Sequence, residues 1–178
     1  PLNKTQAMNK RVLIVNADDF GMRRSINEAV ATLYRRSCIT STTLLAPAAL
    51  AEEACVQAAQ NKWPAGVHWT LHSEWAGQAW PACAGMSTFT DANGLLLADA
   101  KAMAKAAKGR DVSRELEAQV QFMAQHGCPP THADSHGGTL YGTNGRLFFL
   151  SAFKVCKKHN LPFRFAKTAG FLRRQMDG

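Results

Sequence analysis

The chain has 178 residues, of which 46% are hydrophobic and 19% are charged, a composition typical of one globular domain with its own core. It contains no apolar run near the roughly 18 residues of a membrane span, so we expect no membrane partner. The net charge of +8 comes from basic residues spread over several segments without a nucleic-acid-binding motif, so we expect no nucleic-acid partner either.

The start of the chain and its cysteines both bear on the compartment. Residues 1–10 are polar and lack the apolar core of a signal peptide, so we expect residues 1–9 to be a disordered lead and the protein to be cytoplasmic. The five cysteines are odd in number and form no C-x-x-C pair. This pattern predicts reduced, structural thiols rather than disulfides or a zinc ribbon.

Strand and helix signals alternate in the first half of the chain. Residues 12–16 form a continuous apolar run, typical of a strand buried on both faces of a parallel sheet. A helix is predicted to begin near Ser25, which is a suitable N-cap. A second strand follows at 41–46, a second helix at 48–62 and a third strand at 66–71.

The alternation stops over residues 72–98, a long loop of the kind that usually has a function. Beyond it the sequence predicts a helix at 111–125, a strand at 131–135, a helix at 146–159 capped by Asn144, and a fifth strand at 163–166. The repeated βα units predict an α/β fold with a parallel sheet in a single domain, residues 1–178. An open doubly wound sheet and a barrel both fit this repeat, and in both the active site lies at the carboxyl ends of the strands.

Carboxylates and imidazoles gather at three of these strand ends. Asp18 and Asp19 follow the first strand, His68 lies on the third, and His136 ends the fourth. Asp19, His68 and His136 together predict a divalent-metal site, and Asp18 is a spare carboxylate of the kind that hydrolases use. Neighbouring strand residues point to opposite faces, so both aspartates can serve one site only where the strand ends, at residues 20–21.

The fourth strand adds groups that can support such ligands. In an extended strand His132, Asp134 and His136 share a face, so one strand can present a ligand and a carboxylate that orients it. Asn16, His132 and Asp134 are predicted to contact the ligands from behind or to contact the substrate. A structural role is expected for the threonine-rich run 40–43 and for the remaining histidines, His72, His126 and His159.

Four strings of the sequence resemble the YdjC-like carbohydrate deacetylases, a family that includes the chito-oligosaccharide deacetylases. They are N-A-D-D-F-G at 16–21, T-S-T-T-L at 40–44, G-V-H-W-T-L at 66–71 and T-H-A-D-S-H at 131–136. The strings occur in the order of the family and extend through nearly the whole chain.

The resemblance implies a distorted (β/α) barrel of the glycoside hydrolase and deacetylase type that binds a divalent ion, Mg²⁺ or Zn²⁺. It implies removal of an acetyl group from an N-acetylated sugar, a small-molecule carbohydrate. Asp19, His68 and His136 would hold the metal, and Asp18 would be the general base that activates a metal-bound water against the amide carbonyl. The sequence is compatible with a homo-oligomer and with a monomer.

Two departures from the family pattern keep alternatives open. Gly137 and Gly138 stand where the family usually has histidines, which leaves room for a related hydrolase acting on a phosphorylated or otherwise substituted sugar.

Family members are also longer and carry a histidine near the C-terminus that is thought to protonate the leaving amine. A full barrel takes roughly 250 residues, so we expect a barrel truncated after about five strands, lacking its C-terminal part. A catalytically inactive, truncated homologue that binds sugar or metal is the non-enzymatic alternative.

Overall fold

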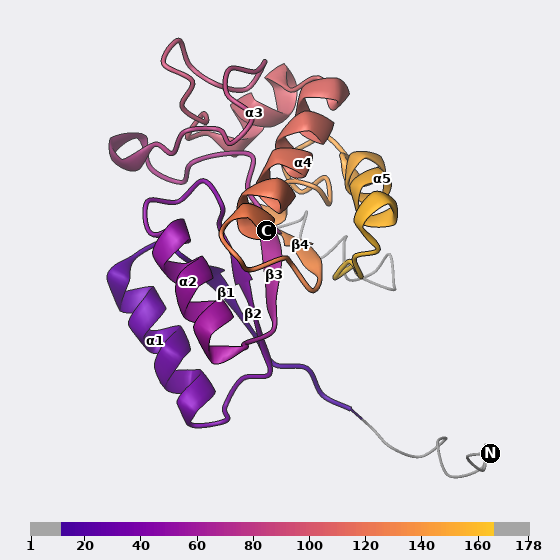
Figure 1. Ribbon diagram of the computed structural model, residues 1–178. Coiled ribbons are helices and arrows are strands. Elements are labelled where there is room, and N and C mark those ends of the chain that lie inside the picture. The colour runs from indigo at the N-terminus through magenta and orange to yellow at the C-terminus, as the bar shows by residue number, and fades with distance from the viewer. Residues whose placement is uncertain (1–11, 166–178) are drawn as a thin grey trace, which may run out of the picture.

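The computed structural model describes residues 12–165, so the predicted lead at 1–9 lies outside the described residues. Its sheet consists of four parallel strands, β1 (Asn16–Phe20), β2 (Ser41–Leu44), β3 (Ala65–Trp69) and β4 (Ala133–Ser135). The strands are neighbours in sequence order, β1-β2-β3-β4 (Figure 1). A doubly wound sheet reverses its order at a switch point, whereas consecutive barrel strands keep it. The predicted α/β fold is confirmed, and the four strands form an open sheet with the strand order of a barrel segment.

Helices follow the strands as crossover connections. They are α1 (Arg24–Arg35), α2 (Ala51–Asn61), α3 (Ala100–Ala106), α4 (Gly109–Gln125) and α5 (Phe149–His159), with two short 3₁₀ turns, η2 (Ala76–Gln78) and η3 (His136–Gly138). Helix α1 packs on β1, α2 packs on β2, and α4 packs on both β3 and α5 (Figure 1). The helices thereby bury the apolar side of the sheet and leave the carboxyl ends of the strands to the connecting loops.

The position predicted for the first strand is wrong. Strand β1 begins at Asn16 rather than at Val12, and the side chains of Val12, Leu13 and Ile14 are exposed. Pairing with β2 starts at Asn16, opposite Ser41, and the apolar run precedes it. Hydrophobicity indicated a strand in this region, but the partner strand decides which residues belong to it.

The fifth predicted strand is reduced to a single bridge within the described residues. Phe163 pairs in parallel with Ala133, and the backbone N–H of Arg164 donates to the carbonyl of Ala133 at 2.9 Å. Residue 166 lies outside the described residues. The bridge nevertheless fixes Arg164 beside β4.

The two predicted N-caps are wrong, and one helix was missed. Arg23 and Phe148 occupy the N-cap positions of α1 and α5, and neither side chain makes a capping hydrogen bond. Asn144 donates instead to the carbonyl of Gly137 at 3.2 Å. Helix α3 lies just beyond the predicted loop and begins after Asp99, whose carboxylate accepts hydrogen bonds from two backbone N–H groups of the first helical turn.

A buried polar stripe on α4 anchors the long loop that follows β3. Glu115 accepts hydrogen bonds from two loop N–H groups, and Asp111 accepts one from the N–H of Thr88 at 3.2 Å. Gln119 donates to the carbonyl of Thr70 and accepts from its N–H. These three α4 side chains are four residues apart and lie on one face, so the loop is held firmly beside the strand ends.

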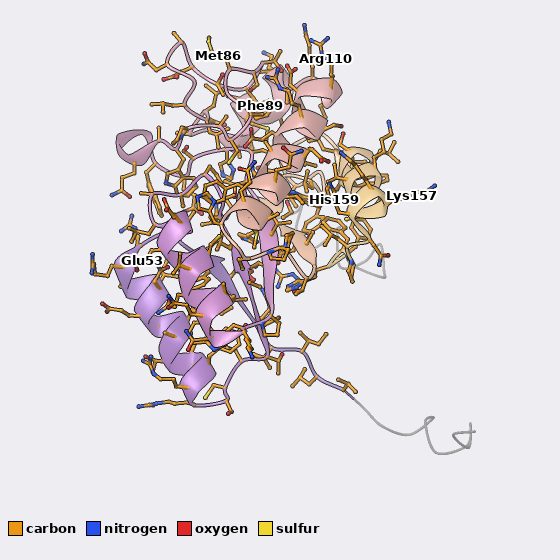
Figure 2. All side chains as sticks on the ribbon, viewed as in Figure 1. Glu53, Met86, Phe89, Arg110, Lys157 and His159 are labelled. Carbon is orange, nitrogen blue, oxygen red and sulfur yellow. The ribbon has the colours of Figure 1, made fainter. Side chains whose placement is uncertain are left out.

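The outer faces of the helices carry the charged side chains. Glu53 of α2, Arg110 of α4 and Lys157 of α5 are all exposed (Figure 2). No helix within residues 12–165 is long and apolar enough to cross a bilayer.

Candidate metal centre

The backbone at Asp19 brings two adjacent carboxylates to one edge of the sheet. The pairing of β1 with β2 shifts register between Ala17 and Phe20. Asp19 itself adopts a left-handed conformation with φ of 66°. Successive side chains of a regular strand point to opposite faces, so this bulge is what lets Asp18 and Asp19 share a site. The turn expected at residues 20–21 therefore occurs at Asp19 itself.

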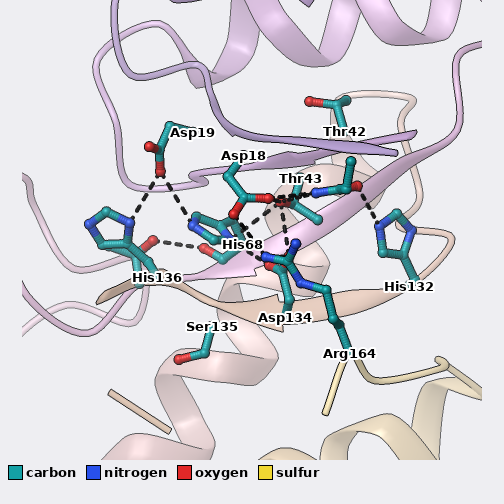
Figure 3. Close-up of polar contacts among 12 residues, drawn as sticks. Asp18, Asp19, Thr42, Thr43, His68, His132, Asp134, Ser135, His136 and Arg164 are labelled. Atoms are coloured by element: carbon teal, nitrogen blue, oxygen red, sulfur yellow. Dashed lines mark hydrogen bonds and ion pairs between the residues drawn. The ribbon is translucent and has the colours of Figure 1, made fainter. Parts of the chain in front are cut away.

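Asp19 faces two buried imidazoles. Its Oδ1 atom lies 3.3 Å from Nε2 of His68 and 3.2 Å from Nδ1 of His136 (Figure 3). The three ligand atoms lie within 4.8 Å of one another. The Oδ1 atom is buried, yet no side chain or backbone group of residues 12–165 forms a geometrically sound hydrogen bond with it. A cation would satisfy this oxygen and both nitrogens at once, so the three predicted ligands fit a divalent metal.

His68 is fixed from behind by a buried carboxylate. Its Nδ1 atom contacts Oδ1 of Asp134, which is fully buried and also accepts from Thr43 Oγ1 at 3.1 Å. Burial alone would lower the pKa of His68, but its contacts with Asp134 and Asp19 raise that pKa to about 9. Because the Nδ1–H group donates to Asp134, the Nε2 atom is the one that faces Asp19.

Both carboxylate oxygens of Asp18 accept hydrogen bonds. Asn16 Nδ2 donates to Oδ1 at 2.6 Å, and Arg164 Nη2 donates to Oδ2 at 2.8 Å. Burial alone would raise the pKa of Asp18, but the hydrogen bond from Arg164, the charge of His68 and the hydrogen bond from Asn16 hold it below its usual range. Asp18 is therefore ionised at neutral pH.

His132 supports Asn16 in turn. Its Nε2 atom lies 3.3 Å from Oδ1 of Asn16, so an Nε2–H group turns the amide nitrogen of Asn16 toward Asp18. Gly66 makes this approach possible, because a Cβ atom there would lie 2.7 Å from the His132 ring. Asn16 contacts Asp18 and Asp134 contacts His68, whereas His132 contacts Asn16 and acts on Asp18 only through it.

A second group of three, Asp18, His68 and Asp134, also lies within 4.8 Å. Arg164 already occupies this place, with Nη2 lying 2.8 Å from Asp18 and 2.7 Å from Asp134 (Figure 3). A cation there would meet the guanidinium charge, so the group containing Asp19 is the better metal site.

Three residues of the site were missed by the sequence analysis. The sequence pattern indicates no role for Arg164, places Glu74 in a loop and predicts a structural role for Thr43. The Thr43 hydroxyl nevertheless contacts Asp18, His68 and Asp134. A threonine on the strand beside two predicted site strands was a usable signal for Thr43. Arg164 and Glu74 reach the site through tertiary packing alone.

His72 was expected to be structural, and it packs against the site. Its ring stacks on that of His136 with 5.3 Å between centroids, and burial together with the charge of His136 lowers the pKa of His72 to about 4. Gly137 permits the stacking, since a Cβ atom there would lie 2.6 Å from Cε1 of His72. The glycine that departs from the family pattern is therefore required by the packing of His72.

The chain matches one protein-family profile and curated proteins that are named as deacetylases. The profile of a family described as YdjC-like protein matches residues 12–177. A carbohydrate deacetylase of Clostridium beijerinckii is 31% identical over 159 residues, covering 89% of this chain and 61% of that protein. A chitooligosaccharide deacetylase of Yersinia enterocolitica is 35% identical over 131 residues, covering 71% of this chain and 49% of that protein. The chain thus spans about three fifths or less of the length of these curated relatives.

A solved structure shares the fold. The crystal structure of an Enterococcus faecalis protein, assigned provisionally to cellobiose-phosphate cleavage, superimposes with a TM-score of 0.72 at 23% identity. The match covers 92% of this chain and 62% of that one. At this identity the likeness supports the arrangement of strands and helices alone.

Proposed function

The chain belongs to the YdjC-like protein family, and we propose that it is a metal-dependent deacetylase that removes the acetyl group from an N-acetylated sugar or oligosaccharide. Curated relatives from two genera carry the names carbohydrate deacetylase and chitooligosaccharide deacetylase. These names belong to proteins that are longer than this chain, so the activity is proposed here on the residues of the site.

One observation carries the proposal. A buried carboxylate oxygen of Asp19, which has no hydrogen-bond partner within residues 12–165, faces Nε2 of His68 and Nδ1 of His136, and the ionised Asp18 directly precedes Asp19 in the chain. Two imidazoles and a carboxylate are one of the common ligand sets of a catalytic metal with an open position. A separate carboxylate beside them is what a hydrolase needs as a proton acceptor.

We assign the roles from these contacts. Asp19, His68 and His136 would hold the divalent ion, which when bound supplies Lewis acidity and lowers the pKa of a water. Asp18 accepts the proton of the attacking water as the water adds to the amide carbonyl of the substrate. Asn16 and Arg164 hold the Asp18 carboxylate in one orientation, and the lowered pKa keeps it ionised, the state in which it can accept a proton.

The experiment has two parts. Calorimetry with Mg²⁺ and Zn²⁺ tests for one site per chain, which Asp19→Asn and His136→Ala should each remove. Acetate release from N-acetylglucosamine oligomers then tests the reaction. Asp18→Asn should bind metal as the parent does and lose roughly 10²–10⁴ in turnover, the usual contribution of a general base.

The results also distinguish this deacetylase function from the alternative functions. Phosphate release, or acetate release only from a phosphorylated substrate, would favour a related hydrolase of substituted sugars. Metal binding without any turnover would favour an inactive sugar- or metal-binding homologue. Turnover that survives Asp18→Asn would rule out Asp18 as the base.

A further inference from the structure

The two metal-binding histidines present opposite ring nitrogens to Asp19. His68 faces it through Nε2 and His136 through Nδ1. An imidazole that binds a metal through one nitrogen carries its proton on the other, and that N–H needs an acceptor. For His68 the acceptor is Asp134, which contacts Nδ1. For His136 the acceptor must lie at Nε2.

Glu74 is the group at that position. Its Oε1 atom lies 3.3 Å from Nε2 of His136, on the edge of the ring that faces away from Asp19. The His136 side chain is only 3% exposed, and its Nε2 atom has no aligned hydrogen-bond partner within residues 12–165. The Glu74 side chain is 33% exposed, and a small rotation of its carboxylate would bring an oxygen into line with the N–H.

The residues on both sides of Glu74 make contacts that hold its segment in place. The preceding residue, Ser73, is fully buried, donates its N–H to the carbonyl of Leu97 at 2.9 Å and accepts from the N–H of Trp80 at 2.8 Å. The following residue, Trp75, stacks against the guanidinium of Arg23 at 4.8 Å. These contacts of Ser73 and Trp75 therefore keep the Glu74 side chain beside His136.

We infer that Glu74 is a positioning residue of the metal centre, which accepts the Nε2–H of His136 and so directs the Nδ1 lone pair toward the metal. The centre then has two carboxylate–histidine pairs, Asp134 with His68 and Glu74 with His136. Both pairs converge on Asp19, one through Nε2 and the other through Nδ1. The inference rests on the metal centre of the proposed function, and it does not depend on which sugar is cleaved.

Metal affinity of the full chain tests the inference directly. Glu74→Ala is expected to weaken Zn²⁺ binding by roughly 10- to 100-fold, the usual effect of losing such a partner. Glu74→Gln keeps an acceptor oxygen and should retain most of the affinity. Glu28→Ala removes an equal charge from the exposed face of α1 and should bind Zn²⁺ as the parent does. Far-UV circular dichroism and thermal unfolding of the metal-free variants establish that each is folded.

A spectroscopic measurement distinguishes positioning from a general effect on the loop. In the zinc-loaded parent, the imidazole ¹⁵N signals of His136 should show the proton on Nε2 and the metal on Nδ1. Glu74→Ala should shift the Nε2–H signal, and Glu74→Gln should restore it in part. A zinc-loaded His136 that carries its proton on Nδ1 would overturn the inference.

The outcomes separate this inference from the proposed function. Equal zinc affinity of Glu74→Ala and the parent overturns the inference and leaves the deacetylase proposal standing. Tight zinc binding that depends on Glu74, without acetate release, supports the inference and counts against the deacetylase. A folded parent that binds no metal overturns both.

Discussion

The guanidinium of Arg164 lies 2.8 Å from the carboxylate of Asp18, although 146 positions separate the two residues in the sequence. The same Nη2 atom lies 2.7 Å from the fully buried Asp134. Arg164 therefore connects the residue proposed as the base with the carboxylate that orients His68, and it balances the charge of both. The bridge between Phe163 and Ala133 is what brings it there.

Replacing Arg164 by alanine should lower both stability and turnover. Asp134 would lose a counter-charge and the pKa of Asp18 would rise. The free energy of unfolding should fall by about 1–2 kcal/mol, less than for a fully buried pair because Arg164 is half exposed and partly screened by solvent. Acetate release should fall at least roughly tenfold, because Asp18 is no longer held in one orientation.

Chemical denaturation and acetate assays measure both effects of the Arg164 change. Arg164→Lys keeps the charge, but an ammonium group cannot replace the planar guanidinium between two carboxylates, so an intermediate loss is expected. Lys157→Ala, at an exposed position on α5, is the control for loss of a positive charge. Equal unfolding free energies for Arg164→Ala and Lys157→Ala would contradict the role given to Arg164.

Metal binding should release a proton from His68. A histidine must lose its extra proton and be neutral to bind a metal, and contacts with Asp134 and Asp19 outweigh burial and raise the pKa of His68 to about 9. The apparent affinity should therefore rise roughly tenfold per pH unit from about pH 7 to about pH 9 and then level off. Calorimetry in buffers of different ionisation enthalpy counts the protons, and an affinity that is flat across this range would refute the prediction.

The same pKa makes a prediction for the metal-free protein. The folded-state pKa of His68 lies above the ordinary value of about 6.5, so its protonation stabilises the fold fully below about pH 6.5. This contribution should disappear as the pH rises through about 9. Thermal unfolding of metal-free parent and His68→Gln over this range should converge at high pH if His68 is the group responsible.

The sequence pattern singled out the three residues that we propose as metal ligands but not all of the residues that support them. Asp19, His68 and His136 were identifiable because their chemistry is local to strand ends, and parallel strands bring such ends together. Arg164 and Glu74 could not be identified in this way, because a bridge at the sheet edge and a loop anchored on α4 place them. The first strand was misplaced because a continuous apolar run was interpreted as a buried strand, whereas Val12, Leu13 and Ile14 are exposed and the pairing of Asn16 with Ser41 determines where β1 begins.

The backbone at Asp19 gives a prediction about strain. Asp19→Gly and Asp19→Ala both remove the ligand carboxylate and should both abolish metal binding. Only alanine places a Cβ atom in the left-handed conformation seen at this residue, which costs roughly 1–2 kcal/mol. After the larger entropy of glycine in the unfolded chain is deducted, Asp19→Gly should be the more stable variant by about 0.5–1 kcal/mol.

Chemical denaturation of the two Asp19 variants checks this difference. The same pair of changes at Glu28, in the middle of helix α1, is the control and should favour alanine by about 1 kcal/mol. The order of stability is therefore expected to reverse between the two positions. If alanine is favoured at both, the left-handed conformation of Asp19 is not maintained in solution.

Gly137 and Gly85 form a matched pair that separates backbone strain from crowding at the metal centre. Both have positive φ, 55° and 73°, but a Cβ atom at Gly85 meets nothing within 4 Å, whereas one at Gly137 lies 2.6 Å from Cε1 of the buried His72. Gly85→Ala should therefore cost about 1 kcal/mol and leave metal binding intact. Gly137→Ala should cost roughly 1–3 kcal/mol more. It should also weaken metal binding, because the displaced His72 ring stacks on His136. Denaturation and calorimetry measure the two effects, and equal losses with unchanged metal affinity would show that His72 can move without disturbing His136.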